Sequence, residues 1–129
     1  MVTMKDSRPR GFTLIELLVA MAIIAALLSI AAPRYIGNID RSKEAVLREN
    51  LSTLRDVLDK YYADNGTYPP TLATLVERRY LRRIPDDPVT QSNRTWVIVP
   101  PPNPEQGAIF DVRSSAQGMT HDGTPYKEL

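Results

Sequence analysis

The chain contains no cysteine, and its 129 residues include only one histidine and one tryptophan. Without thiols it can form neither a disulfide framework nor a thiolate metal site. If the protein is exported, its fold must be held by packing, by an ion bound in another way, or by assembly with neighbouring subunits. The length is that of one domain, without room for a second sizeable core.

The chain also lacks an excess of charge of either sign. Its 16 Lys and Arg residues and 15 Asp and Glu residues give a net charge of +1, and the two kinds are interleaved along the sequence. Proteins that bind nucleic acid gather Lys and Arg on one face. We therefore expect no nucleic-acid partner.

No arrangement of catalytic residues stands out either. The sequence shows no Ser/His/Asp pattern, no glycine-rich phosphate loop and no zinc-ligand spacing. His121 lies in a polar segment, where we expect an exposed side chain without a catalytic role. Asp86 and Asp87 stand between two prolines and read as a solvated turn. We predict that the protein is not an enzyme.

One long apolar run, from Phe12 to Ala32, dominates the first part of the chain. As a helix it is roughly 31 Å long, which matches the hydrocarbon thickness of a bilayer. The apolar region of a cleaved signal peptide is shorter, about 7–15 residues. The run therefore predicts a membrane span. Lys5, Arg8 and Arg10 precede it and should stay on the cytoplasmic side, with the rest of the chain across the membrane.

A second helical pattern follows Pro33 and becomes amphipathic. Proline disturbs a helix in water, but it is tolerated near the membrane where neighbouring helices satisfy the freed backbone groups. Asn65-Gly66 and Pro69-Pro70 supply a stop signal. We predict one helix from about Phe12 to about Ala63. Its apolar stripe consists of Ile36, Ile39, Leu47, Leu51, Leu54, Leu58 and Tyr61.

The remaining sequence predicts a short second helix and a small sheet. Residues 71–81 read as a helix capped by Thr71, with Leu72, Leu75 and Val76 facing inward. Residues 94–99 and 108–112 have strand composition, and residues 122–128 are a candidate third strand. The expected fold class is α+β: an antiparallel sheet packed on the exposed half of the long helix.

The segment RGFTLIE, from Arg10 to Glu16, resembles the prepilin junction of the type IV pilin-like superfamily. The resemblance implies that a membrane-embedded prepilin peptidase cuts between Gly11 and Phe12 and methylates the new amino group of Phe12. It divides the chain into a leader peptide (1–11), a transmembrane assembly helix (12–32) and a periplasmic head (33–129) that includes the amphipathic half of the long helix.

Glu16 is the only charged residue of the apolar run. An acid in the middle of a membrane helix costs on the order of 2.5–3.5 kcal/mol and therefore seeks a partner. Cleavage creates a cation at a similar depth, the amino group of Phe12. In the family that this segment resembles, the acid at the position of Glu16 neutralises the N-terminus of a neighbouring subunit and sets the register of the filament. Pro33 stands where these proteins often carry a proline, in a stretch of helix that changes on assembly.

The segment from Tyr61 to Pro88, YYADNGTYPPTLATLVERRYLRRIPDDP, is similar to one branch of the superfamily, the major (G-type) pseudopilins of type II secretion. The resemblance implies a structural subunit of a filament that drives protein export. Its implied partners are further copies of itself, minor pseudopilins, the prepilin peptidase, and the inner-membrane assembly platform with its ATPase. It implies a single-pass protein of the inner membrane with a periplasmic head.

The same branch often binds calcium through oxygen ligands in its C-terminal loop, as suits this ion. Here the candidate ligands are Asp111, Ser114 and Asp122, whereas Gln117 stands where the family often has an acid. The sequence names no other cofactor.

Two other functions remain open at this point. A type IV pilin or minor pilin, used for adhesion, motility or DNA uptake, would share the N-terminal segment. Many such pilins carry a C-terminal disulfide, which this chain cannot form. A membrane-anchored periplasmic binding protein would need an exposed aromatic or charged pocket. Trp96 is its one candidate, and Trp96 is more simply a strand residue packed on the helix.

Overall fold

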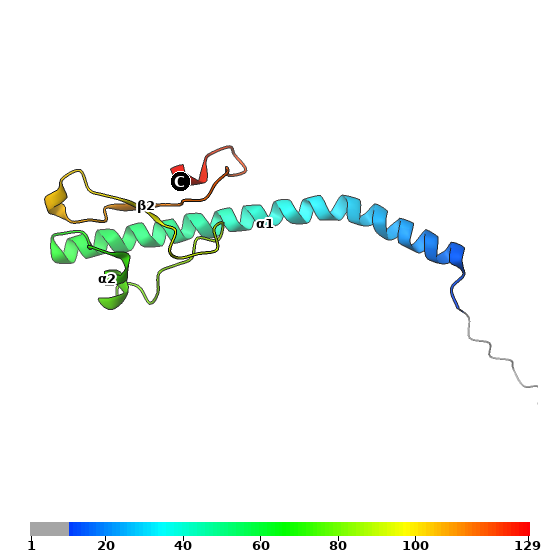
Figure 1. The fold of residues 1–129 in the computed structure, drawn as a ribbon, viewed down its shortest axis with the longest axis horizontal. Helices are drawn as coiled ribbons and strands as arrows, with labels where there is room; N and C mark the ends of the chain where they lie inside the picture. The colour runs from blue at the N-terminus through cyan, green and yellow to red at the C-terminus, as the bar shows by residue number, and fades with distance from the viewer. Residues whose placement is uncertain (1–10) are drawn as a thin grey trace, which may run out of the picture. The chain divides into compact units, whose positions relative to one another are not determined.

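The computed structural model describes residues 11–129. Lys5, Arg8, Arg10 and most of the expected leader peptide lie outside the described residues. The described chain forms two compact units, one that ends at Gly37 and a head from Asn38 to Leu129. In chain order the elements are α1 (Leu14–Asn65), α2 (Leu72–Glu77), β1 (Val97–Val99), the 3-10 helix η1 (Pro104–Gln106), β2 (Asp111–Arg113) and the 3-10 helix η2 (Tyr126–Glu128) (Figure 1). The predicted α+β class is confirmed.

The first unit consists of the apolar part of α1 and the residues just before it. Every side chain from Gly11 to Gly37 is exposed in the isolated chain. Large apolar residues such as Leu14, Ile23 and Ile30 are each more than half exposed. A soluble monomer does not leave so continuous an apolar surface in water. This part of α1 therefore needs lipid or other helices around it.

Within the head, α1 buries one stripe of side chains against the loops and the sheet. The predicted stripe is confirmed from Leu47 to Tyr61, where Leu47, Leu54 and Leu58 are fully buried. The buried part of the stripe does not include its first two members, since Ile36 and Ile39 are 60% and 37% exposed in the isolated chain. Glu44, which is 5% exposed, is the first buried residue of α1 and extends the buried stripe toward the N-terminus.

The C-terminal end of α1 follows the predicted turn chemistry. The helix continues to Asn65, two residues past the predicted Ala63. Gly66 then adopts a left-handed conformation with a φ of 74°, and its N–H donates to the carbonyl of Tyr62 at 2.8 Å. Glycine is favoured in this conformation because it has no Cβ. The side-chain amide of Asn65 donates to the backbone carbonyl of Tyr61 at 2.9 Å.

The short helix α2 begins as predicted and ends earlier. The Thr71 hydroxyl accepts a hydrogen bond from the N–H of Thr74 at 3.3 Å, which confirms the predicted cap. Leu75 is fully buried. The helix stops at Glu77 and not at Leu81, because Arg79 is left-handed with a φ of 63°. Such a residue ends the regular helical hydrogen bonding.

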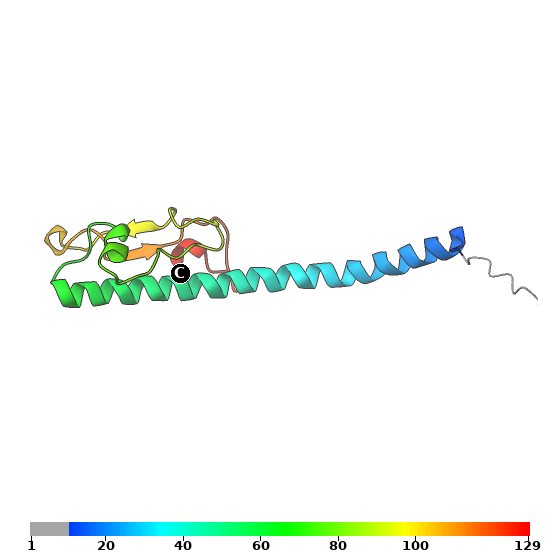
Figure 2. The ribbon, with the colours of Figure 1, turned by 90° about the horizontal axis from the view of Figure 1, so that it is seen from below.

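The sheet has two strands in the described part of the chain, and both are shorter than predicted. β1 and β2 are antiparallel, with Ile98 opposite Val112 at the centre of the register. The sheet lies along the head part of α1, with α2 beside it (Figure 2). The predicted third strand at 122–128 is wrong: this segment makes one isolated bridge, from Met119 to Pro125, and then forms η2. Pro125 has no N–H to donate, so it cannot extend a ladder.

The core joins α1 to α2, to the segment just before β1 and to β2. Its buried members are Leu47, Leu51, Leu54, Val57, Leu58, Tyr61, Leu75, Trp96, Ile109 and Val112. Several polar side chains of α1 add bonds outside this core, and three of them reach different segments of the head. Glu44 bonds to the C-terminal loop, Asn50 to the loop after α2, and Arg55 to β2.

Asp87 is the largest departure from the sequence-based expectation in the head. The predicted solvated turn is wrong here, because Asp87 is fully buried. Its carboxylate accepts hydrogen bonds from the N–H groups of Val89 at 2.9 Å and Thr90 at 3.3 Å. The hydroxyl of Ser114 donates to its other oxygen. A buried carboxylate is retained only with such partners, so Asp87 fastens its loop to the segment after β2.

Candidate functional site

The predicted processing junction lies immediately before α1. Gly11, Phe12 and Thr13 have no regular structure, and Phe12 is 82% exposed. The Thr13 hydroxyl accepts a hydrogen bond from the N–H of Glu16 at 3.1 Å, and the Thr13 carbonyl accepts one from the N–H of Leu17 at 3.0 Å. Thr13 is therefore the N-cap of α1. The junction is therefore accessible and lies outside the helix, and cleavage there stays a prediction.

Glu16 lies in the first turn of α1 and is exposed in the isolated chain. A carboxylate at this position interacts favourably with the positive end of the helix dipole. The structure thus gives Glu16 a local role in addition to the predicted contact with Phe12 of a neighbouring subunit. The contact between subunits stays a prediction.

The part of α1 after Glu16 has the length and composition of a membrane span, and it is the one such helix among residues 11–129. Ala25 accepts a hydrogen bond at its carbonyl from the hydroxyl of Ser29 at 2.8 Å, so the polar atoms of this stretch are satisfied within the helix. The helix continues without a break through Pro33. A role for Pro33 in assembly stays a prediction.

The three predicted calcium ligands have separate partners. Asp111 accepts a hydrogen bond from Nε of Arg55 at 2.8 Å, so a guanidinium already neutralises it. The hydroxyl of Ser114 donates to the buried Asp87. Asp122 accepts from the hydroxyl of Thr120. In this arrangement the three residues do not fit one calcium site, and calcium binding through them stays a prediction.

A cluster around Glu44 joins the C-terminal loop to α1. The N–H of His121 donates to one Glu44 oxygen at 3.1 Å, and Nδ1 of the same residue lies 2.8 Å and 3.0 Å from the two oxygens. Arg48, one turn further along α1, donates to Glu44 at 3.2 Å and lies 3.9 Å from Asp122. The hydrogen bond from His121 is the main reason that the pKa of Glu44 is lowered. The pKa of Asp122 is also lowered, chiefly by the bond from Thr120.

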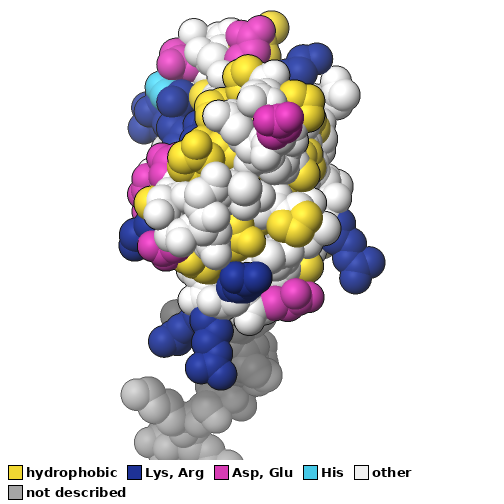
Figure 3. Space-filling view, turned by 90° about the vertical axis from the view of Figure 1, so that its left-hand side faces the viewer, with side chains coloured by type: hydrophobic (Ala, Val, Ile, Leu, Met, Phe, Trp, Pro, Cys, Tyr) yellow, Lys and Arg dark blue, Asp and Glu magenta, His cyan; other side chains and the backbone are white. Residues whose placement is uncertain are grey.

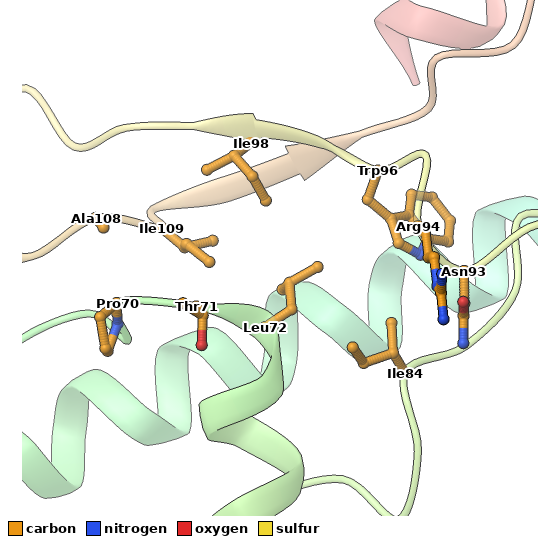
Figure 4. Close-up of a pocket in the computed structure, with 10 residues that line it drawn as sticks. All are labelled: Pro70, Thr71, Leu72, Ile84, Asn93, Arg94, Trp96, Ile98, Ala108 and Ile109. Carbon is orange, nitrogen blue, oxygen red and sulfur yellow. The ribbon is translucent and has the colours of Figure 1, made fainter.

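Trp96 is a core residue, as predicted, although it lies just before β1. It is 7% exposed, and its Nε1 donates to the carbonyl of Pro85 at 2.8 Å. It also borders a pocket of about 380 Å³ between α2 and the two strands. Leu72, Ile98 and Ile109 point into this pocket, and Arg94 lies beside Trp96 at one end (Figure 4). The indole does not form the exposed platform that the binding-protein alternative requires.

The face of the molecule drawn in Figure 3 offers no single charged surface. Hydrophobic side chains are scattered over this face, and charged ones of both signs lie mostly around its edge (Figure 3). This mixture agrees with the interleaved charges of the sequence.

Sequence reasoning missed the buried polar residues of the head. The sequence indicated a solvated turn at Asp87 and an exposed, non-catalytic His121. His121 is exposed as predicted, but it also contacts the buried Glu44. The one available signal was the spacing of Glu44, three residues before Leu47 on the apolar stripe. Their partners lie far away in the sequence, since His121 follows Glu44 by 77 residues.

Comparison with known proteins agrees with the junction and the span. Residues 6–32 match the family described as "Prokaryotic N-terminal methylation motif". The chain is 30% identical to the type II secretion system core protein G of Klebsiella michiganensis, in an alignment that covers 95% of this chain and 90% of the relative. It is 31% identical to the protein of the same name from Escherichia coli strain K12, over 84% of this chain and 81% of the relative.

The protein of the same name from Pseudomonas aeruginosa is 30% identical, over 66% of this chain and 71% of the relative. No solved structure gives a significant match. The 30% identity to the Klebsiella michiganensis protein over 95% of this chain and 90% of the relative, together with the motif at 6–32, shows the family. The chain belongs to the family of type II secretion system core protein G, the major pseudopilins.

Proposed function

We propose that this chain is the structural subunit of a type II secretion pseudopilus, cut after Gly11, methylated at Phe12 and assembled into a helical filament that drives protein export. The observation that carries the proposal is the alignment with core protein G over 95% of the chain. The exposed apolar half of α1 supports it, because that surface needs either lipid or neighbouring helices. The protein acts through assembly and not as an enzyme.

Processing prepares the N-terminus for assembly. Cleavage between Gly11 and Phe12 leaves a free amino group one residue before the cap of α1. Before assembly, Glu16 lies close enough to the start of the helix to reach the membrane interface. In the filament that route is closed, and Glu16 of one subunit pairs with the amino group of Phe12 of the next. A pair of opposite charges at a fixed depth selects one axial register, because any shift leaves both charges unpaired.

The proposed cellular location of the protein follows from its membrane span. The span at 12–32 holds the subunit in the inner membrane as a single-pass protein, with its N-terminus cytoplasmic and the head, 33–129, periplasmic. The partners are other copies of the chain, minor pseudopilins, the prepilin peptidase, and the assembly platform with its ATPase. Pro33 lies at the boundary between span and head, where a local change of the helix would let heads settle against each other.

Two measurements test this proposal. Mass spectrometry of the membrane-extracted protein should show a chain that starts at a methylated Phe12, whereas an uncut chain would contradict it. The Glu16→Ala variant should still be cut and inserted but should form no ordered filaments. Glu16→Gln, which keeps the size without the charge, should behave like Glu16→Ala. The Glu49→Gln variant, which removes an exposed acid of the head, is the matched control and should assemble normally. Normal filaments from Glu16→Gln would refute the pairing.

A secretion assay separates pseudopilus from pilus. In a strain that lacks its own pseudopilin gene, export of a reporter enzyme should return with the wild-type chain and not with Glu16→Ala. A chain that fails to restore export here but restores twitching to a second strain, one that lacks its own pilin gene, would be a type IV pilin instead.

A further inference from the structure

We propose that Glu44, His121 and Asp122 form a binding site for a divalent transition metal of the zinc class, which clamps the C-terminal loop onto α1. Each residue offers one ligand atom, and these atoms all lie within 4.8 Å of one another. Glu44 comes from α1, whereas His121 and Asp122 are consecutive residues of the loop before η2. The inference goes beyond assembly of the filament and does not depend on it.

The spacing of the cluster suits a small tetrahedral ion. Zinc binds imidazole nitrogen and carboxylate oxygen at about 2.0–2.2 Å, so two ligands of a tetrahedral site lie about 3.3–3.5 Å apart. Nδ1 of His121 already lies 2.8 Å and 3.0 Å from the Glu44 oxygens. An ion can therefore replace the proton between them with a movement of roughly half an ångström. The side chain of His121 is 55% exposed, which leaves a path from solvent.

The charge of the cluster favours a cation. Glu44 is almost fully buried on a stripe that is otherwise apolar, and its carboxylate accepts hydrogen bonds from the N–H of His121 and from Arg48. Asp122 adds a second carboxylate, whose pKa is also lowered. The permanent cation among them is Arg48, which lies 3.2 Å from Glu44 and 3.9 Å from Asp122. Two carboxylates against one guanidinium leave a negative site. Arg48, at 48% side-chain exposure, can withdraw into solvent when an ion enters.

The ligand set distinguishes zinc from calcium. Zinc accepts both imidazole nitrogen and carboxylate oxygen as ligands, whereas calcium takes six to eight oxygen ligands. The two other oxygens proposed for calcium are engaged elsewhere, Asp111 with Arg55 and Ser114 with Asp87. A metal at Glu44 would therefore use only Asp122 from the predicted calcium set.

The test measures zinc binding by the full-length chain in detergent, produced without a histidine tag and treated with a chelator. Because the chain has one histidine and no cysteine, binding that needs an imidazole reports on this site alone. We expect one zinc ion per chain in competition with a chromogenic chelator. His121→Ala should weaken binding at least about tenfold, since even the loss of an outer-shell partner of a metal site costs 10–100-fold.

Two further variants sharpen the result. Arg48→Gln removes the competing cation and should tighten zinc binding several-fold, an effect that a merely structural role of the cluster does not produce. Glu49→Gln removes a neighbouring exposed acid and should leave zinc binding unchanged. Zinc should also raise the unfolding temperature of the wild-type chain and not that of His121→Ala. Equal binding by the wild type and His121→Ala, or no saturable binding by the wild type, overturns the proposal. Displacement of the zinc by an equal concentration of calcium would also overturn it, and would assign the site to calcium.

Discussion

The bond between Ser114 and Asp87 gives the sharpest prediction for the stability of the head. Ser114 and Asp87 are both fully buried, and they join segments 27 residues apart in the sequence. The Ser114→Ala substitution removes the hydroxyl that donates to one carboxylate oxygen of Asp87. It also removes the acceptor for the N–H of Ala116, which lies 3.1 Å from the hydroxyl oxygen. The other Asp87 oxygen keeps its bonds to Val89 and Thr90.

The magnitude follows from those contacts. A hydrogen bond to a charged group contributes about 1.5–3 kcal/mol, and a buried polar group left without a partner costs about 1–3 kcal/mol. Because the substitution changes one charged bond and one N–H that share the same oxygen, we expect a loss of about 2–3 kcal/mol in the free energy of unfolding. For a domain of 60–100 residues that lowers the unfolding temperature by about 10–20 °C.

The assay uses the only tryptophan of the chain. Trp96 lies in the core of the head, so its fluorescence during urea denaturation of the full-length chain in detergent follows the head and not the membrane span. Ser115→Ala is the matched control, because Ser115 is exposed and should change stability by less than about 0.5 kcal/mol. If Ser114→Ala is as stable as Ser115→Ala, Asp87 does not depend on this bond and our account of its burial is wrong.

Two further predictions concern the stability of the head, one at Gly107 with Gly66 as its comparison and one at Tyr80. Gly107 has a φ of 120°, and a Cβ there would lie 2.4 Å from the carbonyl oxygen of Tyr68, so Gly107→Ala should destabilise the head by about 3 kcal/mol or more in the same urea assay. Gly66→Ala should lower the free energy of unfolding by only about 1–2 kcal/mol, the cost of a left-handed alanine, since nothing lies near its Cβ position. An equal loss for both substitutions would contradict the predicted clash at Gly107. The hydroxyl of Tyr80 donates to Asp64 at 2.7 Å, and this bond is the main cause that raises the pKa of Tyr80 above its usual value of 10.0. The bond stabilises the head fully below pH 10.0 and is lost as pH rises through the higher folded-state pKa of Tyr80. Urea denaturation from pH 8 to 11 should therefore show a decline in the free energy of unfolding, and Tyr80→Phe should reduce that decline. If the decline is the same in Tyr80→Phe, other groups cause it.

The features that the sequence predicted correctly depend on neighbouring residues. The stripe from Leu47 to Tyr61 has the period of a helix, and that period is visible in any window of the segment. Gly66 and Thr71 end one helix and begin the next through bonds to residues within four positions. These interactions are local, so the sequence contains all the information that they need.

The features that it predicted wrongly depend on distant residues. Charge made Asp87 look solvated, yet it is buried, and Ser114 from the C-terminal part of the chain donates a hydrogen bond to it. The prediction of a third strand at 122–128 was wrong for a different reason. Its composition allowed a strand, but Pro125 lacks the N–H that a ladder needs, and the segment makes a 3-10 helix. Ile36 and Ile39 fit the stripe by period, but both are exposed in the isolated chain.

The polar bonds between α1 and the loops also determine how the head bears load. Glu44, Asn50 and Arg55 are anchored to three different segments along about 16 Å of helix. A pull along α1 strains these three anchors in parallel, as shear, together with the apolar core between them. Bonds loaded in parallel share a force, whereas bonds opened from one end fail one at a time. The head is thus built to transmit an axial push or pull through its long helix without peeling from it.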